Sequence, residues 1–331
     1  MTSVGRRSRG IALLLVIMVM TLMTVIVFAF AESSSIAMLV ARNNMDEMKA
    51  RTAIASAVQY AAVMLKLDRI QSEYDSLDEQ WAQEFELELG DVLATVQIVD
   101  EASKFNMNRF LTARDEPQPA MIELWETAVF AAGLPGDTVD RMLILLEKRA
   151  DTPLEDLEEE EPEELADEEE GQLPDEADAG DEVFLNEYAQ MKVPVRPSEL
   201  ELLLFGEQAD EDSPEQVFCR QITTVSRGHI NLNTVSEALL DYIFTGDDPA
   251  IVETIVAERE IEPFAMAEDM ARVSGIVGTG KARMFTVRST VFAVNVEARV
   301  GPTVKRALCI LKRFKSGQCI PIYYKDDIPA L

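Results

Sequence analysis

The chain has 331 residues, with 60 Asp or Glu against 30 Lys or Arg and a formal net charge of −30. Eighteen of the acidic residues lie between Asp151 and Glu182, but the rest of the chain is acidic as well, which argues against general attraction to nucleic acid or anionic lipid. His229 is the only histidine, which excludes metal sites built from several histidines, and no serine lies in a GxSxG nucleophile motif. We therefore expect a protein that is not an enzyme.

The first predicted element is one helix from about Ile11 to about Ile70. Residues 11–31 contain no charge, Pro or Gly, and a helix of this length spans a hydrocarbon core of about 30 Å. Three arginines precede this run, so the positive-inside rule places the N-terminus in the cytoplasm and the rest of the chain on the other side of the membrane. Beyond residue 31 the apolar residues continue at helical spacing, which predicts an amphipathic stem.

The apolar run by itself leaves three interpretations open. Ala29-Phe30-Ala31 loosely matches the small-x-small site of a cleaved secretory signal. A plain single-pass anchor is the second interpretation. The third is the assembly stem of a fibre subunit, because the amphipathic continuation can pack on its own head and against neighbouring stems.

The remaining elements follow in the order hairpin, helices, strands. Residues 85–101 alternate around Gly90-Asp91 and predict a β-hairpin. Helical patterns follow from 120 to 150 and from 197 to 285, and the acidic run 151–182 is predicted to be a solvated loop because it lacks large apolar residues. Residues 285–324 predict a β-meander with turns at Gly301-Pro302 and Ser316-Gly317.

This order predicts an α+β fold in which one antiparallel sheet is interrupted by inserted helices. The second turn of the meander would place Phe314 opposite Cys319 and Cys309 opposite Tyr324. The sulfurs of Cys309 and Cys319 would then not face each other, so we do not expect a disulfide between them.

The sequence resembles the type IV pilin-like proteins, and within them the minor pseudopilin K family of the type II secretion system (general secretion pathway protein K). The resemblance lies in a short basic leader ending in Gly10, the apolar run from Ile11, and the continuous stem. Further along the chain it lies in "DEASKFNMN", "RPSELELLLFG", "HINLNT" and "REIEPFAMAEDMARVSGI".

The resemblance implies cleavage by a prepilin peptidase between Gly10 and Ile11 and methylation of the new terminal amine of Ile11. Most prepilins have a glutamate at the fifth mature position, where this chain has Leu15. A glutamate buried in an apolar stem is costly unless it meets the amine of the subunit ahead, so Leu15 suggests a subunit at the tip with nothing ahead of it. Contacts with neighbouring stems are expected from Ile36, Leu39 and Val40.

The implied fold is a pilin-like long N-terminal helix packed on an antiparallel sheet, with a large inserted all-α domain of sterile-alpha-motif (SAM) type. The implied division is residues 1–10 leader, 11–31 transmembrane half of the stem helix, 32–70 periplasmic half, 71–104 first part of the pilin-like body, 105–285 inserted helical domain with the acidic loop 151–182, and 286–331 the C-terminal β-meander.

The implied function is assembly at the tip of a periplasmic pseudopilus, which the chain initiates to aid export of folded proteins across the outer membrane. The chain would be a single-pass inner-membrane protein with a cytoplasmic N-terminus and a periplasmic head. The implied partners are other minor pseudopilins in a tip complex, the major pseudopilin, the prepilin peptidase, the inner-membrane assembly platform and membrane lipid. Members of the family can bind calcium, but no ligands are assigned in this sequence.

The alternative is a membrane-tethered DNA receptor. The segment "VSGIVGTGKARM" resembles a helix-hairpin-helix turn, in which backbone N–H groups meet a phosphate and Lys281 and Arg283 would assist. Residues 226–288, however, hold 10 acidic and 6 basic residues, and "FTGDDPA" has two aspartates where a phosphate would lie. We therefore expect no nucleic-acid partner.

Overall fold

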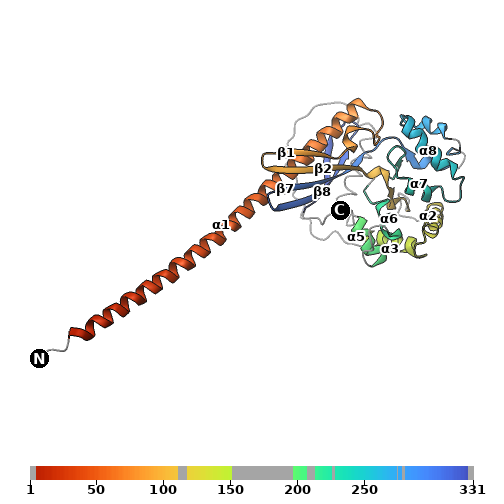
Figure 1. Cartoon of the computed structure of the whole chain (residues 1–331). Coiled ribbons are helices and arrows are strands. Elements are labelled where there is room, and N and C mark those ends of the chain that lie inside the picture. Colours follow the sequence, from red (N-terminus) through yellow and green to blue (C-terminus); the bar gives the residue numbers. More distant parts are fainter. Residues whose placement is uncertain are drawn as a thin grey trace, which may run out of the picture.

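A computed structural model describes residues 5–110, 118–150, 197–206, 213–225, 228–273, 275–277 and 280–326. The acidic loop 151–182 and residues 1–4 of the predicted leader lie outside the described residues. One long helix ends on a head that consists of a sheet and many short helices (Figure 1). The second half of the helix is counted as part of this head, because it packs on the sheet.

Helix α1 (Gly5–Gln71) has 67 residues, which corresponds to about 100 Å at the helical rise. The prediction of a single continuous helix is confirmed, although the helix begins inside the predicted leader. Its first half projects away from the head (Figure 1). Among the described residues it is the one helix long and apolar enough to cross a membrane, with a mean hydropathy of 2.9 over its most apolar 18-residue window, none of which is buried.

The second half of α1 packs on the sheet through a narrow face of small side chains. Ala57 and Ala61 are fully buried, and Ile54 and Leu65 lie on the same face at helical spacing. Alanines allow the helix to lie close to the strands, whose inward side chains include Val96 and complete this core.

The sheet has the strand order β1-β2-β7-β8-β9, with all neighbours antiparallel. Together with the long helix and the added helices it confirms the predicted α+β class. The turns at Gly90-Asp91, Gly301-Pro302 and Ser316-Gly317 lie where they were predicted. The strands are β1 (Phe85–Leu89), β2 (Val92–Asp100), β7 (Val291–Val300), β8 (Thr303–Arg313) and β9 (Cys319–Asp326).

The predicted register between β8 and β9 is half right. Cys309 lies opposite Tyr324 as predicted, but Cys319 lies opposite Arg313 instead of Phe314. The register shifts between Ile310 and Leu311, because the edge strand carries one extra residue next to Pro321, where a proline without an N–H is compatible with an irregularity.

Residues 101–290 connect β2 to β7, two neighbours in the sheet, and are called the insert below. Its own core surrounds Trp125, which contacts the rings of Phe105, Phe110 and Phe218. Trp81, on the short helix η1 (Gln80–Ala82), belongs instead to the core between α1 and the sheet. The boundaries 105 and 285 of the proposed inserted domain stay a prediction.

The elements of the insert are η2 (Glu101–Ser103), β3 (Phe105–Asn106), η3 (Met107–Phe110), α2 (Pro119–Ala131), α3 (Thr138–Ala150), α5 (Pro197–Phe205), α6 (Pro214–Arg220), β4 (Ile222–Thr223), β5 (Ile230–Asn231), α7 (Glu237–Ile243), α8 (Ala250–Ile261), η4 (Ala267–Arg272), η5 (Lys281–Met284) and β6 (Phe285–Thr286). Two short parallel pairs join the ends of the insert to its interior: β3, near its start, pairs with β4, and β6, near its end, pairs with β5.

Candidate functional site

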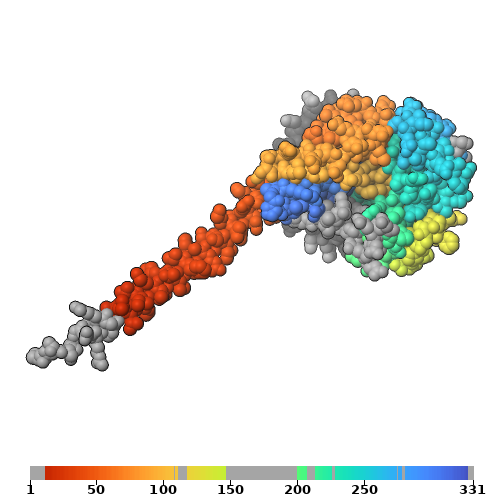
Figure 2. Space-filling view, viewed as in Figure 1, coloured from red at the N-terminus to blue at the C-terminus, as the bar shows by residue number. Residues whose placement is uncertain are grey.

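The first half of α1 is a continuous apolar surface that is exposed in the single chain. Leu15, Ile36, Leu39 and Val40 are 51–61% exposed in the single chain. Gly10 and Ile11 both lie within α1. Figure 2 shows this part of the helix standing free of the head. Exposed apolar area on this scale marks a surface that lipid or protein covers.

The sequence motifs meet at a buried polar joint between the sheet and the insert. Asp100 Oδ2, at the end of β2, accepts hydrogen bonds from Thr234 Oγ1 at 2.5 Å and from Ser289 Oγ at 2.6 Å. Asn231 Nδ2 donates to the same carboxylate oxygen at 3.2 Å and to the backbone oxygen of Asp75 at 3.1 Å. The first aspartate of "DEASKFNMN" and the "INLNT" motif therefore serve to fasten the insert to the sheet.

A second set of motif contacts lies inside the insert. Asn233 Oδ1 accepts from Phe264 N at 2.8 Å, and Asn233 Nδ2 donates to Phe264 O at 2.9 Å. Asp269 Oδ2 accepts from the backbone N–H groups of Ala265 and Met266 at 2.9 and 3.0 Å. These hydrogen bonds satisfy buried or helix-terminal polar groups, so the role of these motif residues is to stabilise the fold of the insert.

Arg313, at the end of β8, lies in the middle of a buried ionic cluster. Its NH1 donates to Asp68 Oδ2 at 2.9 Å, and its NH2 donates to Asp75 Oδ1 and to Ser289 O. The side chains of Arg313 and Asp75 are each only 2% exposed. The guanidinium thus ties the end of α1 to the following loop and to the sheet.

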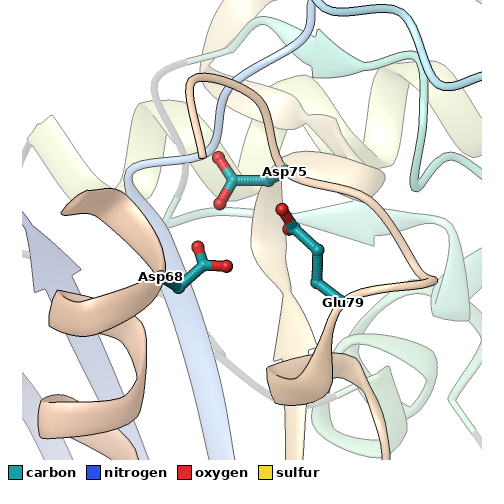
Figure 3. Close-up of side chains that lie close together, drawn as sticks. All are labelled: Asp68, Asp75 and Glu79. Atoms are coloured by element: carbon teal, nitrogen blue, oxygen red, sulfur yellow. The ribbon is translucent and has the colours of Figure 1, made fainter. Parts of the chain in front are cut away.

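Glu79 completes the cluster from the other side. Its Oε2 accepts from Ser76 N at 2.9 Å and from Trp81 Nε1 at 2.8 Å. The carboxylates of Asp68, Asp75 and Glu79 point toward one another, with oxygens within 4.8 Å (Figure 3). The cluster thus holds three carboxyl groups and one guanidinium, which leaves an excess of negative charge when all three are ionised.

This crowding and burial raise two carboxyl pKa values. Burial, followed by the charges of Glu79 and Asp75, raises the pKa of Asp68 to about 7. Burial also raises the pKa of Asp100 to about 6, against the opposing effect of its hydrogen bonds from Ser289 and Thr234. Both groups hold a proton more tightly in the folded chain than an ordinary aspartate does.

Asp68, Asp75 and Glu79 form the one group of three potential metal ligands among the described residues. Calcium takes six to eight oxygen ligands at about 2.3–2.6 Å. Here one oxygen of Asp68 and both of Asp75 accept hydrogen bonds from Arg313 or Ser289 N, and a calcium ion would lie against the guanidinium. The cluster does not fit calcium, and its positive partner is Arg313.

The helix-hairpin-helix alternative depended on Lys281 and Arg283. Lys281 Nζ donates to the backbone oxygen of Ile243 at 2.7 Å and pairs with Asp247, one of the two aspartates of "FTGDDPA". Its charge also lies 5.3 Å from the centre of the Phe244 ring. Arg283 is exposed. Lys281 therefore joins two turns of the insert.

A long apolar helix that ends on an antiparallel sheet is a pilin-like arrangement. No protein-family profile and no curated protein matches the sequence. Among solved structures, the chain is similar to one chain of the GspK–GspI–GspJ complex from the type 2 secretion system of enterotoxigenic Escherichia coli. The TM-score is 0.58 at 16% identity, over 87% of this chain and 99% of that chain. The likeness shows a pseudopilin-like fold.

Proposed function

We propose that this chain is a minor pseudopilin K-type subunit of a type II secretion system, anchored by residues 11–31 in the inner membrane with its head in the periplasm. The proposal is carried by the fold likeness to a chain of a minor pseudopilin complex over nearly all of that chain. The free apolar half of α1 supports it, because an assembly stem must offer such a surface. The other minor pseudopilins would be its direct partners.

The proposed place in the assembly is the tip, where the chain would initiate the fibre ahead of the major pseudopilin. Leu15 supports this place, because a subunit with none ahead of it has no terminal amine for a glutamate to neutralise. Ile36, Leu39 and Val40 would pack on the stems of the following subunits. Before its stem leaves the membrane, the chain would contact lipid, the prepilin peptidase and the assembly platform.

The mature N-terminus is the most direct test. Intact-mass and N-terminal peptide spectrometry of the chain purified from cells with a prepilin peptidase should show a start at N-methylated Ile11. Gly10→Val should leave the leader attached, because the peptidase site is expected to accept only the small glycine. Gly5→Val, the same change inside the leader, should be processed as the wild type. A start at Glu32, or an intact wild-type chain, would rule the proposal out.

The tip position is tested by Leu15→Glu. A charged side chain costs about 2.5–3.5 kcal/mol at the bilayer centre by insertion measurements. Position 15 lies nearer one end of the span 11–31, so the cost there is smaller, but at the tip no partner amine would offset it. We expect the membrane-inserted variant to recover fewer minor pseudopilins by co-purification and to initiate fewer fibres, whereas Leu15→Met should behave as the wild type. Initiation at the wild-type level by Leu15→Glu, with equal amounts in the membrane fraction, would remove the tip assignment.

A further inference from the structure

A groove runs along the outer side of α1 at the point where the helix reaches the insert. Its volume is about 610 Å³, and its walls come from the last turns of α1, the loop that follows, and residues 265–266 of the insert. Figure 2 shows the end of α1 and the insert side by side on this face of the head. The groove is therefore a feature of the assembled head, with walls from segments far apart in the sequence.

One wall of the groove is apolar and exposed. Tyr60, Val63 and Leu67 follow one another at helical spacing along α1, and the Tyr60 ring also contacts the Phe85 ring of the edge strand β1. Val63, Leu67 and, across the groove, Met266 are 51–55% exposed. Large exposed apolar side chains around a concave surface indicate a site where another molecule binds and covers them.

The floor of the groove is acidic. Asp68 and Glu79 line it, and behind them lies Asp75 with its partner Arg313. Glu73 also lines the groove, and its carboxylate pairs with Arg288 at 3.1 Å. One oxygen of each of the other two lining carboxylates, Asp68 Oδ1 and Glu79 Oε1, accepts no hydrogen bond from the described part of the chain. The Arg313 guanidinium does not occupy these two oxygens, so both can still accept a hydrogen bond from a molecule in the groove.

We propose that this groove binds a short segment of a partner subunit that carries one lysine or arginine between apolar side chains. The apolar side chains would cover Val63, Leu67 and Met266, while the cation would donate to Asp68 and Glu79. An ammonium or guanidinium suits the floor better than a metal ion, because it needs only one or two free oxygens and brings several donors. The pairing would be partly shielded from water, which strengthens it relative to an open surface pair.

This proposal rests on the proposed function in one respect only, namely that the chain binds partner subunits in an assembly. The partner is defined by charge complementarity: three ionised carboxylates and one guanidinium leave an excess of negative charge, which a second cation reduces. An acidic or purely apolar segment would leave the floor unmatched, and the acidic segment would also be repelled.

The test uses the full chain in lipid nanodiscs and three synthetic peptides. The first has a central lysine flanked by leucines, and the other two carry norleucine or glutamate in its place. Fluorescence anisotropy, corrected with empty nanodiscs, should show the lysine peptide binding about tenfold more tightly than the norleucine peptide, and the glutamate peptide binding most weakly.

Two variants assign the binding to the groove. Glu79→Gln keeps an oxygen for Ser76 N and Trp81 Nε1. It removes one of the two carboxylates that meet the cation, so it should lower the affinity for the lysine peptide toward that for the norleucine peptide. Val63→Asn, which removes apolar cover without adding a charge, should weaken the binding of both the lysine and the norleucine peptide. Glu88→Gln, on an exposed residue of β1 outside the groove, should change nothing.

Three results would overturn the inference: no binding by any peptide, equal binding by all three, or full binding to the Val63→Asn variant. These outcomes are independent of the N-terminal processing that tests the proposed function. A chain that is cleaved at Ile11 but fails the peptide test keeps its proposed function and loses the groove partner. A chain that binds the lysine peptide but is not cleaved at Ile11 keeps the groove partner and loses the proposed function.

Discussion

Replacing Arg313 with methionine is expected to lower the free energy of unfolding of the head by about 3–5 kcal/mol. The change keeps most of the aliphatic volume but leaves Asp75, which is 2% exposed, as a buried carboxylate without its cation. It also removes the hydrogen bonds from the guanidinium to Ser289 O and Leu65 O and its stacking over the Phe292 ring. The cost is large because one side chain joins α1, the following loop and the sheet.

Urea unfolding of the full chain in detergent measures this effect. In a Trp125→Phe background the fluorescence comes from Trp81, whose indole N–H donates to the Glu79 carboxylate of the same cluster. The midpoint should move to lower urea with little change in slope. Arg299→Met is the matched control, since Arg299 is 62% exposed and its pair with Glu297 should contribute at most about 1 kcal/mol.

The double variant Arg313→Met with Asp75→Asn separates the cost of unpaired charge from lost packing. Removing the stranded carboxylate should recover part of the loss, so that the double variant is more stable than the sum of the two single changes predicts. Strict additivity, or an Arg313→Met variant as stable as the Arg299→Met control, would show that the ionic cluster does not fasten the helix to the sheet.

Local patterns explain why much of the fold could be predicted. The absence of Gly and Pro between residues 11 and 71 predicted α1, and glycine-containing turns predicted the hairpins. The one-residue error opposite Cys319 arose at the irregularity near Pro321, because strand alternation alone does not reveal an extra residue in a strand. The apolar stem residues could also be found, since their helical spacing is visible in the sequence.

The polar joint and the ionic cluster could not be predicted in the same way. The motifs around Asn231 and Asp100 were visible, but their contacts depend on how the insert folds back on β2 and β7. Arg313 ends an apolar strand, and Asp68 ends a helix, so that each alone reads as an ordinary charged residue at the end of an element. Only the tertiary fold shows that they form a buried pair at 2.9 Å.

The two raised carboxyl pKa values predict that the head loses stability as the pH rises from about 5 to about 7.5. An unfolded aspartate has a pKa of about 3.9, whereas Asp68 and Asp100 in the fold have pKa values of about 7 and about 6. The folded chain thus holds more protons than the unfolded chain in this window, so deprotonation favours unfolding. The stabilisation is complete below the unfolded pKa, and the part of it lost between pH 5 and pH 7.5 should be about 4 kcal/mol.

The measurement is the free energy of unfolding in urea at half-unit steps of pH, compared between the wild type and Asp68→Asn. The amide keeps an oxygen for Arg313 but cannot titrate, so the decline of stability between pH 5 and pH 7.5 should become shallower. Asp137→Asn, the same change at an aspartate whose side chain is 54% exposed, shows what the loss of one surface charge does to the slope. Equal slopes in the wild type and Asp68→Asn would mean that the Asp68 carboxyl does not take up a proton in this range, and that Arg313 neutralises it fully.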